Sequence, residues 1–191
     1  PYFITRVTDR NGVVLEENRP QSREVSDPAP LYVLTNMLES VMNLGTGARA
    51  RTLGFTRPAG GKSGTTNDYS DAWFIGFTPD VVTAVWVGFD ERKPIGHKMT
   101  VSAAALPAWV EIMKTATANR PESDFTVPDG VVFQTVCGET GLLATDQCPN
   151  PVDEIFLRRF APSEPCDRHG GGFFKRLFNR FRSRPSIPDT H

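Results

Sequence analysis

The chain has 191 residues, of which 39% are hydrophobic and 23% are charged, and these fractions are typical of a globular protein with a buried core. Its formal net charge of -1 at pH 7 gives no electrostatic reason to expect a nucleic acid partner. No run of about 18 apolar residues occurs, so the sequence predicts no membrane-spanning segment within it. Because the first residue is Pro1 and not methionine, we expect a fragment or a processed product.

The first quarter of the chain predicts a hairpin followed by a helix. Residues 2–16 alternate apolar and polar side chains around the turn sequence DRNG. Ser26 or Asp27 can cap a helix that has Pro28 in its first turn, and Gly45 and Gly47 end it. The apolar positions at helical spacing are Leu31, Leu34, Met37, Leu38, Val41 and Met42.

The middle of the chain predicts an antiparallel sheet and a second helix. We expect strands at residues 61–66, 72–77 and 82–89, the last two joined by a tight turn. A helix over 102–117 places its apolar side chains on one face. These are Ala103, Leu106, Val110 and Met113. By residue type alone, the aromatic side chains in these segments are predicted to lie in the core. They are Trp73, Phe74, Trp86 and Trp109.

The composition changes after Asn119, where prolines separate short extended pieces. We interpret residues 119–169 as a small irregular or β-rich module appended to a unit at 1–118. Residues 170–191 form a basic tail. This tail can form an amphipathic helix on an anionic membrane, or it can be a disordered, solvated segment.

All three cysteines, Cys137, Cys148 and Cys166, lie in the appended module. They can be independent free thiols, they can form a disulfide in an oxidising compartment, or they can bind a metal with the nearby His169. The absence of a C-x-x-C pair argues against zinc.

The segment GGKSGTTN at 60–67 carries the most specific chemistry. In a strand, Lys62 and Gly64 share one face with Thr66, while Ser63 and Thr65 share the other. A cation, hydroxyl groups and free N–H groups suit a substrate carboxylate and a developing oxyanion. A phosphate-binding P-loop is excluded because Thr56 stands where its first glycine is required. The remaining alternative is a polar loop at the start of a strand.

Lys62-Ser63-Gly64-Thr65 resembles the K-T-G element of penicillin-binding proteins and class A β-lactamases. The surrounding residues are similar to class A penicillin-binding proteins over about residues 2–118. The matching features are the Gly-Thr-Gly turn at 45–47, the Asp-x-Trp-Phe-x-Gly stretch at 71–76, the Thr-Pro pair at 78–79, the Val-Trp-Val-Gly strand at 85–88 and the segment AAALPAWVEIM at 103–113. The stretches GLLATDQCP and EPCDRH are similar to C-terminal extensions of some members.

The resemblance implies an α+β fold, an antiparallel sheet with packed helices that forms part of the penicillin-binding transpeptidase fold. It implies a serine D,D-transpeptidase that acylates on D-Ala-D-Ala stem peptides and is sensitive to penicillin. Lys62 would supply positive potential, and Ser63, where threonine is commoner, would contact the substrate carboxylate or fix the motif. Gly64 would leave room for the substrate backbone, and Thr65 would place its N–H in the oxyanion hole.

The family's other two motifs, S-x-x-K and S-x-N, are not found in this chain. The resemblance therefore implies that the nucleophilic serine lies upstream and that the chain is inactive alone. A peptidoglycan glycosyltransferase domain and a membrane anchor would also lie upstream. We expect an uncovered apolar face and a tendency to aggregate in the isolated chain.

The implied location is the periplasmic face of the inner membrane, and the implied ligands are stem peptides, lipid-linked glycan and β-lactams, with no cofactor, metal or nucleic acid. An extracytoplasmic location favours a Cys148–Cys166 disulfide with Cys137 free or buried. Two alternatives remain on the same scaffold: a non-catalytic module that binds peptidoglycan or a partner, and a D,D-carboxypeptidase or β-lactamase-like hydrolase.

Overall fold

The computed structural model describes residues 3–19, 23–66, 68–96 and 99–169. Its helices and antiparallel strands confirm the predicted α+β class. The basic tail at 170–191 lies outside the described residues, as does His97. Within the described ranges, no helix has the length and apolar character needed to cross a bilayer.

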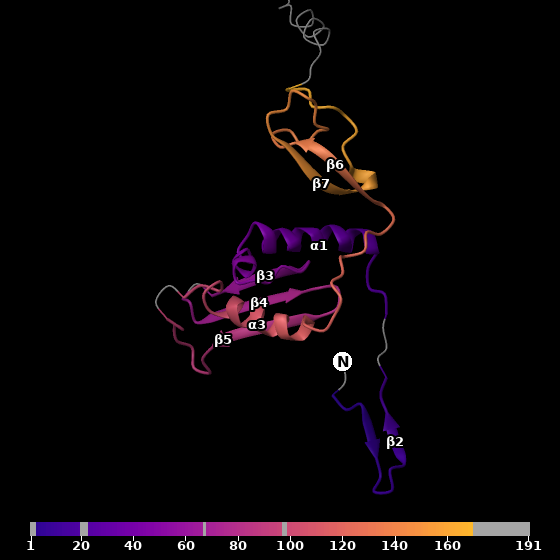
Figure 1. Cartoon of the computed structure of the whole chain (residues 1–191), viewed down its shortest axis with the longest axis vertical. Helices are drawn as coiled ribbons and strands as arrows, with labels where there is room; N and C mark the ends of the chain where they lie inside the picture. Colours follow the sequence, from indigo (N-terminus) through magenta and orange to yellow (C-terminus); the bar gives the residue numbers. More distant parts are fainter. Residues whose placement is uncertain (1–2, 20–22, 67, 97–98, 170–191) are drawn as a thin grey trace, which may run out of the picture.

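The first element is the predicted hairpin, formed by β1 (Arg6–Thr8) and β2 (Val14–Glu17). Its turn is held by the Asp9 carboxylate, which accepts hydrogen bonds from the N–H groups of Asn11 at 2.8 Å and Val13 at 2.9 Å. Gly12 has a φ of 82°, which an L side chain rarely adopts. The hairpin extends away from the rest of the chain in Figure 1.

A three-stranded antiparallel sheet forms the centre of the molecule, in the order β3-β4-β5 (Figure 1). Its strands are β3 (Gly60–Thr65), β4 (Asp71–Phe77) and β5 (Val82–Gly88). The three predicted strands are thus confirmed to within one residue at each end. Because β4 is central, β3 is an edge strand of this sheet.

Three helices accompany this sheet: α1 (Pro28–Asn43), α2 (Arg49–Thr52) and α3 (Ala105–Thr117). Asp27 occupies the N-cap position of α1, as predicted, but its side chain accepts no capping hydrogen bond. The short α2 was not predicted, because its four residues carry no complete amphipathic pattern. Helix α3 begins at residue 105, and residues 101–104 before it form turns.

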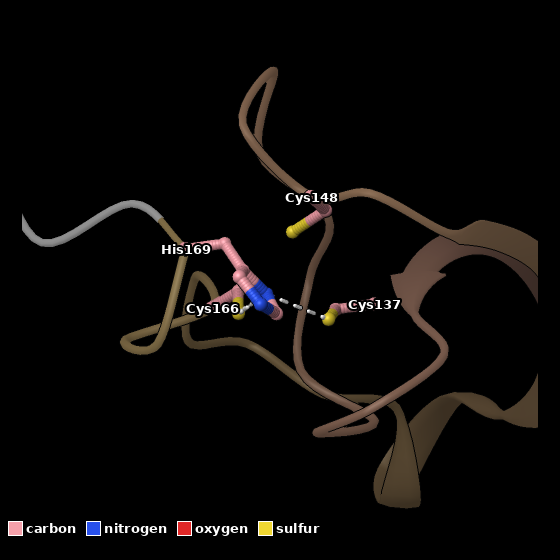
Figure 2. A group of neighbouring side chains, drawn as sticks. All are labelled: Cys137, Cys148, Cys166 and His169. Atoms are coloured by element: carbon pink, nitrogen blue, oxygen red, sulfur yellow. Dashed lines mark hydrogen bonds between the residues drawn. The ribbon is translucent and has the colours of Figure 1, made fainter.

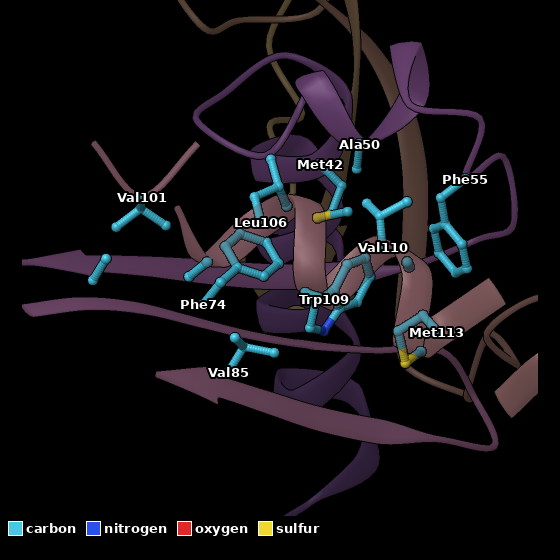
Figure 3. Close-up of a cluster of buried hydrophobic side chains, with 13 residues drawn as sticks. Met42, Ala50, Phe55, Phe74, Val85, Val101, Leu106, Trp109, Val110 and Met113 are labelled. Carbon is cyan, nitrogen blue, oxygen red and sulfur yellow. The ribbon is translucent and has the colours of Figure 1, made fainter. Parts of the chain in front are cut away.

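The hydrophobic core lies between the sheet and α3, as Figure 3 shows. Trp109 is fully buried, and its ring lies edge-on to Phe55 and Phe74, each at 5.2 Å between centroids. The Trp109 indole N–H reaches the carbonyl oxygens of Gly76 at 3.3 Å and Thr83 at 3.2 Å. These contacts satisfy its polar atom inside an apolar core and lock α3 onto β4 and β5.

Two of the predicted core assignments are wrong. Trp73 and Trp86 are 45% and 42% exposed, because they occupy the alternate positions of β4 and β5 that point away from α3. They pair directly across the strands, with ring centroids 6.2 Å apart. On α1, three of the six apolar positions at helical spacing are also exposed, namely Leu31, Leu34 and Met37. Within the described residues, nothing buries these two apolar surfaces.

The C-terminal module is built on a second hairpin of β6 (Val131–Cys137) and β7 (Pro151–Leu157), followed by the 3₁₀ turn η1 (Arg158–Phe160). The expected small β module is therefore present. In Figure 1 it lies beside α1, on the far side from the β1–β2 hairpin. The domain boundaries at 118/119 and 169/170 stay a prediction.

Candidate active-site edge and a cysteine–histidine cluster

The segment Lys62–Thr65 lies on the edge strand β3, whose position is set by two preceding glycines. A Cβ on Gly61 would lie 2.9 Å from Phe74 Cζ and 3.1 Å from Met42 Sδ. A Cβ on Gly60 would lie 3.1 Å from Leu38 Cβ. The absence of these side chains lets α1 approach the first half of β3 closely and leaves the second half to carry the polar residues.

Strand pairing separates the motif into two faces, as its sequence predicted. Lys62 and Gly64 pair with Ile75 and Trp73 on the exposed face of the sheet. Lys62 is itself exposed and makes no ion pair with any described residue. Its Nζ donates to the carbonyl oxygen of Ser63 at 2.6 Å, so the ammonium group stays at the strand edge.

Ser63 is held by the Gly45-Thr46-Gly47 turn that follows α1. The hydroxyl oxygens of Thr46 and Ser63 lie 2.9 Å apart, within hydrogen-bonding distance. The Gly47 N–H donates to Val41 O at 3.0 Å, which ties the turn to the end of α1. The structure therefore gives Ser63 a partner from this chain, which favours the role of fixing the motif over that of contacting a ligand.

The turn between β3 and β4 is organised by hydroxyl and carboxylate groups. Thr66 Oγ1 accepts hydrogen bonds from the N–H groups of Ser70 and Asp71, both at 3.0 Å. Asp71 accepts from Ser70 Oγ at 2.8 Å and from Trp86 Nε1 at 2.9 Å. These two hydrogen bonds, that of Ser70 first, lower the pKa of the Asp71 carboxyl. Asp71 thus fixes the local structure of this turn.

An ion pair also closes this turn. Arg92 Nε lies 2.9 Å from Asp68 Oδ2, and this hydrogen bond is the main reason why the pKa of Asp68 is well below its usual range. A pocket of about 530 Å³ opens beside the turn, and its lining includes Thr66, Trp86 and Arg92. The Thr65 end of the edge strand therefore lies near a pocket that polar and aromatic side chains line.

A separate cluster forms in the C-terminal module, where the three cysteines and His169 converge (Figure 2). Their ligand atoms all lie within 4.8 Å of one another. His169 Nδ1 lies 3.3 Å from Cys137 Sγ and 3.4 Å from Cys166 Sγ. Cys137 and Cys166 are fully buried, and Cys148 is half-buried.

The thiols differ in acidity because their surroundings differ. Burial opposes ionisation of Cys137, but hydrogen bonds from the backbone of Glu139 and from Thr140 prevail and lower its pKa to about 6. Hydrogen bonds from Thr145 favour the Cys148 thiolate, yet burial and the two neighbouring sulfurs raise its pKa. The pKa of Cys166 is lowered, chiefly by its hydrogen bond with Thr140, so Cys148 is the one of the three thiols whose pKa is raised.

In this structure all three cysteines are free, and the Cys148–Cys166 bond predicted from the sequence is not formed, so that pairing stays a prediction. Glu139 was not assigned any role from the sequence, and His169 was considered only as a possible metal ligand beside Cys166. The spacing Cys166-x-x-His169 could have found the cluster, because it equals the C-x-x-C spacing whose absence argued against a metal. Thr46 was also missed, since its contact with Ser63 joins residues distant in sequence.

Comparisons with known proteins agree with the fold. Residues 127–171 match the family described as "Penicillin-binding protein 1A, C-terminal domain". Penicillin-binding protein 1A of Aquifex aeolicus (strain VF5) is 40% identical over 166 residues, which cover 87% of this chain and 22% of that protein. The Pseudomonas aeruginosa protein of the same name is 36% identical over 157 residues, which cover 82% of this chain and 19% of its own length.

A solved structure shows the same likeness in three dimensions. The crystal structure of penicillin-binding protein 1A from Haemophilus influenzae has a TM-score of 0.76 and 26% sequence identity with this chain. The match covers 86% of this chain and 30% of that one. The chain thus spans about a fifth of the length of these curated relatives and about a third of the solved protein.

Proposed function

The chain matches the C-terminal part of class A penicillin-binding proteins, and on this basis we propose that it forms the lysine-bearing wall of a serine D,D-transpeptidase active site. The observation that carries this proposal is the exposed ammonium group of Lys62 on an edge strand. A cation on an open strand edge can attract the terminal carboxylate of a peptide without first breaking an ion pair.

The strand edge would also bind the peptide backbone. An edge strand has unpaired N–H and C=O groups, and an extended peptide can pair with them as an added strand. Gly64 has no side chain to obstruct such a peptide, and a Cβ built on it would meet only Trp73 Cβ, at 3.5 Å. The D-Ala-D-Ala end of a stem peptide has the extended backbone and carboxylate that this edge would recognise.

Acyl transfer would occur at the penultimate D-Ala carbonyl. A serine upstream of this chain would attack it, D-Ala would leave, and an amine from a neighbouring stem peptide would resolve the ester. The Thr65 N–H would donate to the oxygen that becomes negative, and removing such a donor costs about 3 kcal/mol of transition-state stabilisation. Ser63 and Thr46 would hold the strand edge in register for this contact.

The remaining half of the domain would cover the exposed face of the sheet. Trp73, Ile75 and Trp86 form an apolar patch there, on the same face as Lys62. If the other half of the domain packs on this patch, it would bring the nucleophilic serine to the same face of the sheet as Lys62. A glycosyltransferase domain, a membrane anchor and a periplasmic location would come with the rest of the protein.

Product analysis separates this proposal from the two alternatives. The protein containing the upstream serine would be incubated with a stem pentapeptide ending in D-Ala-D-Ala, with and without an acceptor amine. A transpeptidase releases D-Ala and forms the amide with the acceptor. A carboxypeptidase gives only the shortened peptide when acceptor is present. A β-lactamase-like hydrolase leaves the peptide intact and turns over penicillin, and a non-catalytic module does neither. Each of these three results contradicts the proposal.

A further inference from the structure

We propose that Cys137, Cys148, Cys166 and His169 bind one zinc ion in a closed tetrahedral Cys₃His site that holds the C-terminal module folded. The four residues come from three separate segments: the end of β6, the β6–β7 connection and the segment after η1. This site is remote in sequence from Lys62 and is independent of the proposed transferase chemistry.

The distances fit this geometry. Zinc–sulfur bonds of about 2.3 Å and zinc–nitrogen bonds of about 2.0 Å at tetrahedral angles separate sulfur from sulfur by about 3.8 Å and sulfur from nitrogen by about 3.5 Å. The two sulfur–nitrogen distances to His169 Nδ1 are 3.3 and 3.4 Å, and no pair among the four atoms exceeds 4.8 Å. A movement of about 1 Å would complete the tetrahedron.

The surroundings of the cluster are those of a metal site. His169 points Nδ1 at the sulfurs, and its Nε2 lies 3.4 Å from Glu139 Oε2 (Figure 2 shows the ring orientation). Metal-bound histidines usually donate their second N–H to a carboxylate, which fixes the tautomer and the ring. Arg168 holds that carboxylate at 2.8 Å. The chain thus supplies both the imidazole ligand and the groups that orient it.

Two of the sulfurs also accept hydrogen bonds from groups fixed in the loops. The Thr145 N–H donates to Cys148 Sγ at 3.3 Å, and the Thr140 hydroxyl donates to Cys166 Sγ at 3.4 Å. Such bonds spread the negative charge of thiolate ligands. On binding zinc, the three thiols lose their S–H protons to solvent, the neutral imidazole coordinates through Nδ1, and no electron is transferred.

The module has little else to hold it together. Among its described residues, 119–169, only four are buried, and two of these are the ligands Cys137 and Cys166, the others being Val131 and Val136. Units of this size usually need a disulfide or a metal because their hydrophobic core is too small. A single Cys148–Cys166 disulfide would involve neither Cys137 nor His169, whereas a metal ion would bind all four residues.

Zinc is the ion that this ligand set favours. Three thiolates and one imidazole in a tetrahedron select zinc over magnesium or calcium, which prefer oxygen ligands. Four protein ligands leave no open position for water or substrate, so the site would be structural and not catalytic.

The test uses the complete chain, purified without chelator and analysed for zinc by elemental mass spectrometry and for free thiols by titration. We expect one zinc per chain and, after exchange with Co²⁺, the absorption bands of tetrahedral thiolate-bound cobalt. Chelation should speed amide hydrogen exchange in β6 and β7 while leaving β4 and β5 protected. Absence of stoichiometric zinc, with Cys148 and Cys166 joined in the peptide map, would overturn the proposal in favour of the disulfide.

Variants of residues outside the predicted disulfide separate the two explanations further. His169→Ala should weaken zinc binding by at least about 100-fold, and Glu139→Gln by about 10- to 100-fold. His169→Cys should restore binding, since it returns a fourth ligand. Asp167→Asn is the matched control, because this neighbouring carboxylate makes no contact with the cluster among the described interactions. A folded His169→Ala variant that binds zinc with the native affinity would refute the site.

Discussion

Gly64 and Gly76 lie in the paired strands β3 and β4. We predict that replacing each by alanine changes the free energy of unfolding in opposite directions. A Cβ on Gly76 would lie 2.6 Å from Trp109 Cζ2 and 2.8 Å from Cε2. Trp109 cannot yield, because it is fully buried and donates to two backbone oxygens. Overpacking of this kind costs about 1–3 kcal/mol of unfolding free energy.

Gly64→Ala is the matched comparison. Its Cβ would make only an ordinary 3.5 Å contact with Trp73 Cβ, and its φ is not positive. Replacing glycine by alanine within a strand should therefore raise the unfolding free energy, by up to about 1 kcal/mol. Because Gly64 lies on the proposed peptide-binding edge, the same methyl group should slow acylation by penicillin in the protein that contains the upstream serine.

Denaturant unfolding followed by tryptophan fluorescence measures the first effect, and labelling with a fluorescent penicillin measures the second. We expect Gly76→Ala to lower stability and Gly64→Ala to lower acylation at unchanged or higher stability. If Gly64→Ala unfolds as easily as Gly76→Ala, or if it acylates at the native rate, the division of β3 and β4 into a packed face and a binding face is wrong.

Three further predictions concern the groups around this edge. Thr46→Val removes the 2.9 Å hydrogen bond to Ser63 and should lower the free energy of unfolding by about 0.5–1.5 kcal/mol. Thr46→Ser, which keeps the hydroxyl group, should restore it. If Thr46→Val and the native chain are equally stable in urea, this contact does not stabilise the fold. The pKa of Asp68 is lowered chiefly by Arg92, so its carboxylate stabilises the fold above its ordinary pKa of 3.8 and this contribution is lost as the pH falls below about 4. Asp68→Asn should therefore show a smaller loss of stability than the native chain between about pH 6 and pH 3, and identical pH profiles in urea unfolding would exclude this role. Trp73→Thr should reduce self-association of the isolated chain in sedimentation experiments, because it removes part of the exposed patch on the sheet, and a native chain that is already monodisperse would show that the patch causes none.

Much of this fold could be predicted from local patterns. The short apolar runs of β4 and β5, the turn between them and the glycines after α1 place these elements to within a residue or two, because local composition and turn chemistry are local properties. The faces were harder to predict. Trp73 and Trp86 are apolar, yet they lie on the side of the sheet opposite α3, and hydrophobicity alone cannot indicate which of two apolar faces is covered within this chain.

The two candidate sites also differ in how far the sequence could predict them. Lys62 and its neighbours were found because consecutive residues carry the chemistry, whereas the partner of Ser63 comes from a turn 17 residues earlier. The convergence of Cys137 with His169, 32 residues apart, depends on how the β6–β7 connection folds back on itself. Only the short Cys166-x-x-His169 spacing carried a local signal for that cluster.

The proposed role of Lys62 is tested most directly by the rate of acylation with a fluorescent penicillin in the protein that contains the upstream serine. Lys62→Ala should acylate at least about 100-fold more slowly, a loss comparable to removing one oxyanion donor. Lys93→Ala, which removes an exposed lysine from the loop after β5, should acylate at the native rate. Native-rate acylation of a folded Lys62→Ala protein would contradict the central claim.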